Sequence, residues 1–385
     1  MPTGNRLEGR DGETDLRGRG PHPVAAGLVG SGQVSFGAHP LGRAKQPAHA
    51  SMSVFASGFN NPRGLTFGPD GNLYVAEGVS AVPTRPSACV PRPPARPRRT
   101  LAARTTRCLA AASRRVSPAG VVTPVVNALP SSQTSPAIGS LVSGVSSVAF
   151  IGNQLYALLA GAGCSHGVPD VPNGVIEVGP GGAWHLIADL SAFEAANPVA
   201  NPDEEDFEPD GTWYSMISIG GALYPMDSNH QELDRVTPRG AISRVLDISA
   251  LFLDWIGPTA IAHHGVTYIA NLGPFGPSDG LGDEHVYRLT PNRALKARAS
   301  GLEQVLGLAF RGGKMYALEM STTGGGPTLG TGAIVRVRSG APAETVVSGL
   351  TFPTGMTVGP DGAFYVSERG FGFGAGAGRV LRITP

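Results

Sequence analysis

A short strand pattern recurs along the chain and marks its repeats. Each copy carries a tyrosine at its second position, and the copies are LYVAE (73–77), LYALL (155–159), LYPMD (223–227), TYIAN (267–271), MYALE (315–319) and FYVSE (364–368). An apolar stretch precedes every copy, and a tight turn such as GPDGN, HG or GG joins the two stretches. Such short turns suit hairpins with positive φ. The pattern therefore predicts six antiparallel β-hairpins.

Two more strands follow most of these hairpins, as in residues 233–248 and 286–300. Four strands per repeat and six repeats are typical of an all-β, six-bladed β-propeller. The last repeat carries only three strands of its own, whereas SVFASG (53–58) stands before the first repeat and is similar to the outer strand TVVSG (345–349). We therefore expect the N-terminal strand to pair with the last blade, which closes the ring and removes exposed sheet edges.

The composition agrees with a turn-rich β protein. The chain has 55 Gly and 34 Pro among its 385 residues, and only 15% of its residues are charged. Hydrophobic residues still make up 41%, which is enough for a core and excludes a fully disordered chain. No run of about 18 apolar residues occurs, so the sequence predicts no transmembrane segment.

The net charge of +1 hides an uneven distribution. Residues 79–115 carry nine Arg and no acid, residues 1–50 sum to +2, and the other 298 residues sum to −10. We interpret residues 1–50 as a disordered N-terminal extension and residues 51–385 as a monomeric propeller with a basic, Pro-rich inserted loop at 79–115. Part of that loop, 82–112, also fits an out-of-frame stretch of a GC-rich gene. The loop has no aromatic residue that could stack on bases, so we expect no nucleic-acid partner.

The cysteines do not predict a disulfide framework, because there are only three. Cys89 and Cys108 lie in the inserted loop, and Cys164 begins the run Cys-Ser-His at 164–166. No CxxC pair or Cys/His cluster with the spacing of a zinc site occurs. Cys164 or Ser165 would need a base within hydrogen-bond reach to act as a nucleophile, and adjacent residues rarely provide one. The redox compartment stays open at this point.

Several longer motifs resemble one known family. They are FASGFNNPRGLTFGPDGNLYVAEG (55–78), LYALLAGAGCSHGVPDVPNGV (155–175), ADLSAFEAANPVANPDEEDFEPDGTWYSM (188–216), NHQELDRVTPRGAISRV (229–245) and FPTGMTVGPDGAFYVSERGFGFGAGAGRVLRI (352–383). On these residues, nearly all of 53–385 resembles the ScyD/ScyE family of NHL-like propellers. The resemblance implies a secreted, extracytoplasmic protein and brings no established catalytic residues. The chain departs from the family in its basic loop and at 24–34, where Gly and Ser interrupt the only apolar stretch that could serve as a signal peptide.

The longest connections are expected on one face of the propeller, and binding sites favour loops on a rigid scaffold. The third position after the repeat tyrosine is polar in five of six copies: Glu77, Asp227, Asn271, Glu319 and Glu368. If these residues ring the channel mouth, Glu77, Glu319 and Glu368 are candidate ligands of Ca²⁺ or another divalent cation. The alternative is that each acid bonds backbone amides within its own blade.

Other polar and aromatic residues lie in the same class of connection. His166, Asp227, His230 and Asn271 are the candidate ligand-binding residues of the mouth, although a turn-stabilising role for the histidines is the plainer interpretation. The acidic loop 201–214 lacks the spacing of an EF-hand, so it is either a peripheral calcium clip or a charged loop with Phe207 and Trp213 packed inward. The Gly-rich loops also offer an apolar rim of Phe275, Phe371 and Phe373.

Two classes of function survive. No complete catalytic constellation is visible, so catalytic residues stay unknown and the sequence favours a non-enzymatic binding protein for an unknown protein, glycan or small molecule. The alternative is a metal-dependent hydrolase or lactonase with a cation at the channel mouth. A propeller lyase with His166 or His230 as its base is a weaker third. The first two are distinguished by whether the side chains at four strand ends converge on one point, namely Glu77, Asn271, Glu319 and Glu368.

Overall fold

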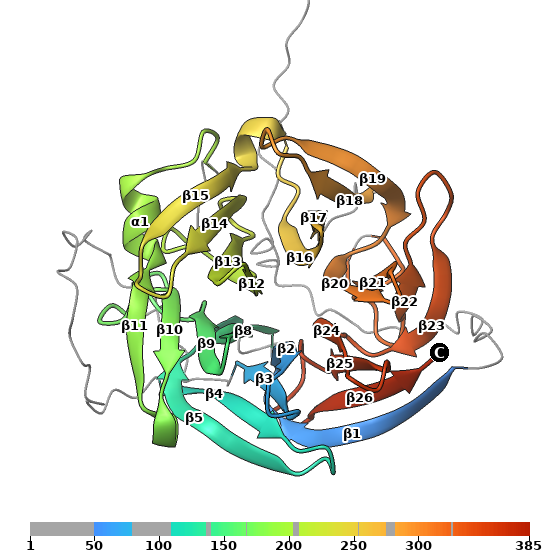
Figure 1. The fold of residues 1–385 in the computed structure, drawn as a ribbon, viewed down its shortest axis with the longest axis horizontal. Coiled ribbons are helices and arrows are strands. Elements are labelled where there is room, and N and C mark those ends of the chain that lie inside the picture. The colour runs from blue at the N-terminus through green and yellow to red at the C-terminus, as the bar shows by residue number, and fades with distance from the viewer. Residues whose placement is uncertain are drawn as a thin grey trace, which may run out of the picture.

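The protein forms a ring of six four-stranded antiparallel sheets around a central axis (Figure 1). This confirms the six-bladed, all-β propeller that the sequence predicts. The structure is a computed structural model, and it describes residues 50–78, 109–135, 140–166, 168–202, 208–252, 254–274, 282–324 and 326–385.

The blades follow the chain in order, and each runs from an inner to an outer strand. Blade 1 contains β2 (Pro62–Phe67), β3 (Leu73–Glu77), β4 (Leu109–Val116) and β5 (Val122–Pro130). Blade 2 contains β8 (Val145–Ile151), β9 (Gln154–Leu159), β10 (Gly174–Val178) and β11 (Trp184–Asp189). Blade 3 contains β12 (Trp213–Ile219), β13 (Ala222–Asp227), β14 (Glu232–Val236) and β15 (Ile242–Asp247).

The second half of the ring repeats this arrangement. Blade 4 contains β16 (Pro258–His264), β17 (Val266–Asn271), β18 (Glu284–Leu289) and β19 (Leu295–Leu302). Blade 5 contains β20 (Val305–Arg311), β21 (Lys314–Glu319), β22 (Gly332–Arg336) and β23 (Glu344–Leu350). Blade 6 contains β24 (Gly355–Val358), β25 (Phe364–Glu368), β26 (Gly378–Thr384) and, outermost, β1 (Ser51–Phe59).

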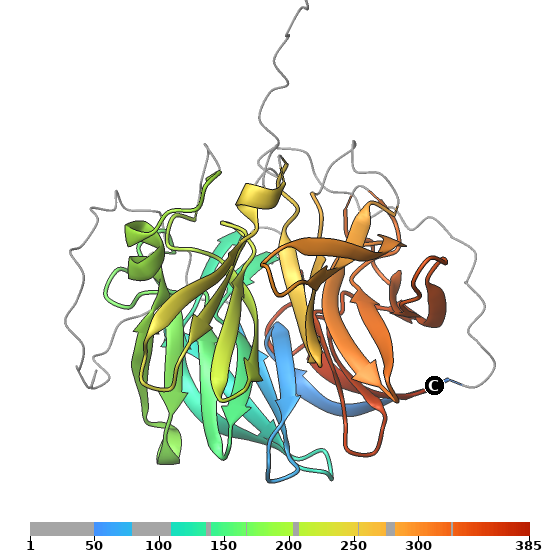
Figure 2. The same ribbon diagram turned by 45° about the horizontal axis from the view of Figure 1, so that its top comes forward.

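A few short elements connect the blades. The strands β6 (Ser132–Ser135) and β7 (Ser140–Ser143) form a small two-stranded sheet in the connection from blade 1 to blade 2. The other elements are the helix α1 (Leu190–Ala196) and the 3₁₀ turns η2 (Pro180–Gly182) and η3 (Ser249–Leu251). Figure 2 shows α1 towards the opposite end of the ring from the β2–β3 hairpin. No helix among the described residues is long and apolar enough to cross a membrane.

The strand β1 pairs antiparallel with β26, so the first and last strands of the described chain share blade 6. Their register runs from Ser51 opposite Thr384 to Phe59 opposite Gly378. Phe59 is completely buried and Ala56 nearly so, although the outer face of the strand is exposed. The pairing occupies the outer edge of β26, which would otherwise present unpaired backbone groups.

Among the described residues, six hydrophobic clusters each lie between two neighbouring blades. A seventh, smaller cluster contains Leu306, Met320 and Phe352. Both faces of a blade are therefore covered, which is why β3 and β25 are buried along their whole length instead of on alternate residues. The repeat tyrosines bridge several of these interfaces. Tyr74 packs edge-on against Phe150 of the next blade with ring centroids 4.9 Å apart, and Tyr316 does the same with Phe364 at 4.9 Å.

The aspartate of the turn motif GPDG stabilises the hairpin through its side chain. Asp70 accepts hydrogen bonds from the Asn72 amide at 3.2 Å and from the Tyr74 hydroxyl at 2.9 Å. Gly71 follows with a φ of +76°, a conformation that side-chain-bearing residues rarely adopt. The motif thus fixes the hairpin and one end of the repeat tyrosine together.

One boundary predicted from the sequence is wrong. Residues 109–115, which the charge pattern assigns to the basic inserted loop, lie in β4 and supply the third strand of blade 1. Arg114 is not a solvated loop residue, since its Nε donates to Glu77 Oε2 at 2.8 Å. The expected N-terminal extension up to residue 49 and the loop residues 79–108 lie outside the described residues.

Candidate functional site

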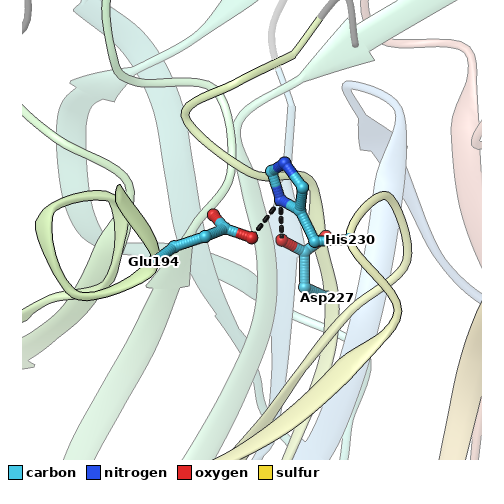
Figure 3. Close-up of side chains that lie close together, drawn as sticks. All are labelled: Glu194, Asp227 and His230. Carbon is cyan, nitrogen blue, oxygen red and sulfur yellow. Dashed lines mark hydrogen bonds and ion pairs between the residues drawn. The ribbon is translucent and has the colours of Figure 1, made fainter. Parts of the chain in front are cut away.

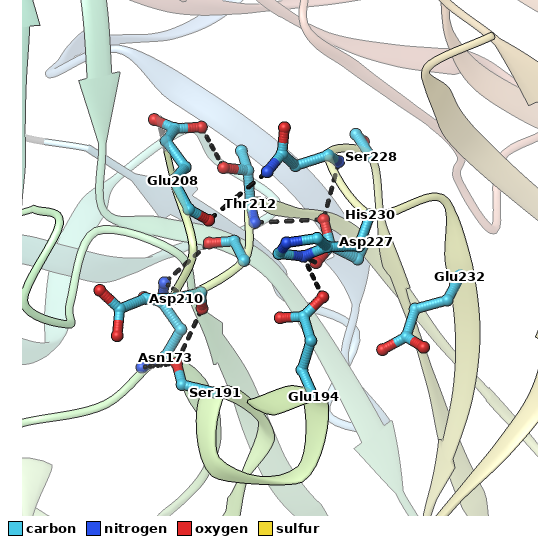
Figure 4. A network of polar contacts seen from close by, with 12 residues as sticks. Asn173, Ser191, Glu194, Glu208, Asp210, Thr212, Asp227, Ser228, His230 and Glu232 are labelled. Atoms are coloured by element: carbon cyan, nitrogen blue, oxygen red, sulfur yellow. Dashed lines mark hydrogen bonds and ion pairs between the residues drawn. The ribbon is translucent and has the colours of Figure 1, made fainter. Parts of the chain in front are cut away.

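A group of buried and half-buried polar side chains lies at the junction of blades 2 and 3 (Figure 4). Its members come from β13, from α1 and from the connections around them, and they are Asn173, Ser191, Glu194, Glu208, Asp210, Thr212, Asp227 and His230. We refer to these residues as the junction cluster. It brings together three of the four predicted ligand-binding residues, namely His166 at its border, Asp227 and His230.

The segment before β12 is held in place by two side chains of blade 2 and α1. Asn173 Nδ2 donates to the carbonyl of Gly211 at 2.9 Å, and Ser191 Oγ donates to the carbonyl of Asp210 at 2.7 Å. The Ser191 hydroxyl also accepts from the Asn173 amide at 3.1 Å. These bonds satisfy buried backbone groups and fix the segment that precedes Trp213.

Helix α1 carries Glu194 into the cluster. Asp189 caps the helix, since its side chain accepts from the Ala192 amide at 2.9 Å. Leu190 and Glu194 are both buried, and they are four residues apart, so they share one face of the helix. The strand and turn pattern of the sequence predicts no helix here, so the structure adds this element.

Asp227 ends β13 and is completely buried. Its Oδ1 accepts hydrogen bonds from the amides of Thr212 at 3.1 Å and Asn229 at 2.8 Å. Its Oδ2 faces His230, whose Nδ1 lies 3.1 Å away. Asp227 Oδ1 therefore binds backbone amides, whereas Oδ2 contacts the titratable side chain of His230.

Glu194, Asp227 and His230 form a compact trio (Figure 3). His230 Nδ1 contacts Glu194 Oε1 as well as Asp227 Oδ2. One nitrogen or oxygen of each side chain lies within 4.8 Å of the others, and no other group of three or more His, Cys, Asp and Glu among the described residues meets this condition. The trio is 4%, 0% and 8% exposed respectively.

Burial sets the charge states of the trio. Burial, with the negative charge of Asp227, raises the pKa of Glu194 to about 10, against hydrogen bonding and charge from His230. Burial also acts to raise the pKa of Asp227, but hydrogen bonds and the charge of His230 outweigh it, so the Asp227 pKa is lowered. Burial thus favours the neutral form of the Glu194 carboxyl, whereas His230 favours the ionised form of Asp227.

His166 borders the cluster from the Gly-rich loop of blade 2. It is 1% exposed; its Nε2 lies 3.4 Å from Glu208 Oε1, and its Nδ1 lies 3.3 Å from Ser165 Oγ. Burial disfavours the imidazolium, yet Glu208 and Asp210 raise the pKa of His166 overall. Ser165, His166 and Glu208 are thus in sequential contact, in the order of a nucleophile, a base and a carboxylate. The backbone amide of Ser165, however, donates to Asp210 Oδ2 at 2.6 Å and is not available to bind an oxyanion.

Cys164 is disulfide-bonded, so it offers no thiolate for nucleophilic attack. No cysteine spacing in the sequence predicts this bond.

The carboxylates predicted as metal ligands do not come together. Glu77, Glu319 and Glu368 each accept from a backbone amide at the start of their own blade: Asn60 at 2.9 Å, Glu303 at 3.1 Å and Thr351 at 2.7 Å. Arg114 and Arg379 further neutralise Glu77 and Glu368. These three acids therefore act as clamps within blades, as the alternative interpretation expected.

Asn271 also stays within its blade. Its Oδ1 accepts from the His285 amide at 2.8 Å, which ties β17 to the start of β18. Of the four predicted mouth residues, Asn271 is thus the one that the structure does not place with the others.

A cavity of about 180 Å³ lies at the mouth of the central channel, beside the junction cluster. Its wall is largely apolar and includes Tyr214, Trp255, Leu272, Met320 and Phe371, and its polar groups include Arg63, Glu208 and Asn229. Two aromatic rings have their polar edges bound to backbone carbonyls: the Tyr214 hydroxyl donates to Thr354 at 2.9 Å, and Trp255 Nε1 donates to Ser228 at 3.1 Å. A second cavity of about 510 Å³ follows the inner strands towards the hairpin face.

The predicted aromatic rim is present in part. Phe371 and Phe373 both pack edge-on against Phe352, with ring centroids 5.7 and 6.2 Å apart. Phe371 also lines the mouth cavity. Phe275 and Phe207 lie outside the described residues, whereas Trp213 is completely buried, as the inward-packing interpretation expected.

Sequence reasoning missed Glu194, Tyr214 and Trp255. Glu194 precedes its partners by 33 and 36 residues and sits in a helix that the strand pattern did not predict. Tyr214 lies within the quoted motif 188–216, but neither Tyr214 nor Trp255 has a fixed place in the repeat. The acidity of residues 201–214 was a signal for Glu208 and Asp210, but it did not indicate their partners.

Comparison with known proteins identifies the fold and goes no further. No family model and no curated protein matches the chain. Among solved structures, a putative oxidoreductase described as a glucose dehydrogenase from Thermus thermophilus is 18% identical, with a TM-score of 0.54, over 87% of this chain and all of that one.

Two further structures show the range of enzymes on this fold. The PQQ-bound aldose sugar dehydrogenase from Streptomyces coelicolor is 13% identical, with a TM-score of 0.50, over 88% of this chain and 99% of that one. A gluconolactonase from Xanthomonas campestris is 10% identical, with a TM-score of 0.50, over 87% and 90%. At these identities the likeness establishes the propeller alone, because one fold hosts many activities.

Proposed function

We propose that this protein is an extracytoplasmic, ScyD/ScyE-like binding propeller that holds a small aromatic ligand in its mouth cavity without transforming it. The observation that carries the proposal is the cavity itself. About 150 Å³ is enough for a benzene-sized molecule, so about 180 Å³ suits one aromatic ring or a compact fused pair.

The cavity wall has the composition of a ligand site. Tyr214, Trp255 and Phe371 supply aromatic faces, and each is only partly buried. The backbone bonds to Tyr214 and Trp255 hold two of these rings before any ligand arrives, which reduces the ordering cost of binding. A few polar groups at the edge of an apolar pocket typically fix the orientation of a ligand.

The extracytoplasmic location rests on the family resemblance and on one supporting feature. Disulfides persist in oxidising compartments and are rare in the reducing cytosol. The bonded state of Cys164 therefore agrees with a protein that functions outside the cytoplasm.

The experiment is calorimetric titration with indole and phenol, with cyclohexanol as a non-aromatic control of similar size. Saturable one-to-one binding of the aromatic compounds is expected. Trp255→Ala should weaken it at least tenfold, whereas Trp184→Ala, a change of another half-buried tryptophan in β11 outside the cavity, should leave it unchanged. Equal binding by both variants, or no saturable binding at millimolar ligand, refutes the proposal.

A metal-dependent hydrolase is the second candidate, and one observation favours it. The trio of Glu194, Asp227 and His230 supplies two carboxylates and an imidazole, which are ligands of catalytic metals. It ranks second because the trio is buried beside the mouth instead of opening into it. Hydrolysis of a simple lactone that depends on added divalent ions would reverse this order.

A further inference from the structure

We propose that Glu194, Asp227 and His230 bind one divalent transition-metal ion, of the Zn²⁺ class, that joins α1 to blade 3. This site is independent of the aromatic-ligand proposal, and neither requires the other.

The donor atoms fit such an ion. Two ligands of a tetrahedral ion with bonds of about 2.1 Å lie about 3.4 Å apart, and His230 Nδ1 and Asp227 Oδ2 are 3.1 Å apart. All three donors are within 4.8 Å of one another, so small side-chain rotations bring them to one centre. An imidazole nitrogen with two carboxylate oxygens favours a transition-metal ion over Ca²⁺, which prefers oxygen ligands throughout.

Neighbouring groups hold the donors in the required direction. Both hydrogen bonds from the amides of Thr212 and Asn229 go to Asp227 Oδ1, which leaves Oδ2 to face the trio. The cap at Asp189 fixes the start of the helix that carries Glu194. Outer contacts of this kind orient the ligands of metal sites and contribute to affinity.

An unpartnered indole provides a separate indication of a ligand. Trp213 is completely buried, and its Nε1 has no hydrogen-bond partner in the described part of the chain. A Cβ added at Gly211 would lie 2.7 Å from Trp213 Nε1, Glu194 Oε2 and Asp227 Oδ2, so all three atoms face the same small space above this glycine. A buried N–H requires an acceptor, and a water molecule bound to the ion as its fourth ligand would supply one.

The surrounding charge also calls for a cation. Glu232 and Asp234 are completely buried in the adjacent strand β14, and Arg244 is paired with Glu232. Burying several carboxyl groups close together is costly unless a positive charge compensates. A dication bound by the trio would supply such a positive charge.

The test is metal binding by the full chain, after chelation and dialysis, measured by calorimetric titration with Zn²⁺ and by metal analysis. One Zn²⁺ per chain and a raised unfolding temperature are expected. Glu194→Gln should weaken Zn²⁺ binding at least tenfold. The matched control is Glu319→Gln, the same change at another buried carboxyl outside the trio, and it should bind Zn²⁺ as the unchanged protein does.

X-ray absorption of the zinc-loaded, unsubstituted protein tests the site even if Glu194→Gln fails to fold. One imidazole and oxygen ligands are expected. The proposal is overturned if less than one ion binds at tenfold excess Zn²⁺, if sulfur or several imidazoles surround the ion, or if folded Glu194→Gln binds it undiminished.

Discussion

The pH dependence of stability tests the charge state of Glu319. Its side chain is 4% exposed, and its Oε1 accepts a hydrogen bond from the Glu303 amide at 3.1 Å. Burial raises the pKa of Glu319 from 4.5 to about 8; the Glu303 amide opposes this shift and the Glu303 charge adds to it. Unlike Glu77 and Glu368, Glu319 has no arginine partner among the described residues.

The sign of the effect follows from proton binding. The folded protein holds this proton more tightly than the unfolded chain, so the contribution to stability is fully present below pH 4.5 and is lost as the pH rises through 8. One pKa unit corresponds to about 1.4 kcal/mol, so about 3 kcal/mol of this contribution is lost by pH 7 and about 5 kcal/mol above pH 8.

Glu319→Gln removes this dependence, because the amide is neutral at every pH and its Oε1 still accepts from the Glu303 amide. The variant should match the unchanged protein near pH 4.5 and be more stable by about 3 kcal/mol at pH 7. The measurement is urea unfolding at pH 4.5, 7 and 8.5, followed by circular dichroism.

Glu368→Gln is the control, since it makes the same change at the equivalent strand end where Arg379 pairs with the carboxylate. It should destabilise the protein at pH 7. A stability difference between Glu319→Gln and the unchanged protein that stays constant across the three pH values would contradict the reasoning.

Three further predictions concern the ring and its links. Deleting residues 50–59 should make the protein aggregate, as measured by size-exclusion chromatography, because the edge of β26 and the pocket of Phe59 become exposed. Arg114→Ala should lower the free energy of unfolding by about 2–3 kcal/mol, because Glu77 stays buried without its partner, and adding Glu77→Gln should recover part of the loss. Cys164→Ser should cost about 2–4 kcal/mol, and a reductant should destabilise only the unsubstituted protein.

The fold could be predicted because its signals are local and repeated. A strand of five residues, a tight turn and a tyrosine recur six times. The tyrosine repeats because the same interface repeats: Tyr74 meets Phe150 of the next blade, as Tyr316 meets Phe364. The turn repeats because Asp70 and the glycine after it are needed for the hairpin.

The site could be predicted only in part. Asp227 and His230 are three residues apart on a loop that the propeller places on the long-connection face, so their meeting was within reach of the sequence. Glu194 belongs to the neighbouring connection, and it reaches them only because blades 2 and 3 pack together. No spacing of residues in the sequence predicts the contact of Glu194 with Asp227 and His230.

The predicted ring of carboxylates shows the other limit. The sequence places the backbone of Glu77, Glu319 and Glu368 at equivalent strand ends, and that placement is correct. It does not give the direction of the side chains, which backbone amides at the start of each blade decide. A buried carboxylate needs a hydrogen-bond donor, and the tertiary structure decides which donor lies within reach.

The sequence by itself thus determined the number of blades and the hairpins within them, because strand and turn preferences act between residues that are near in the chain. The tertiary structure decided which polar groups are buried together, which carboxyls are clamped and where the mouth cavity lies. These depend on contacts between blades, whose energies come from desolvation and hydrogen bonding between groups that are distant in the sequence.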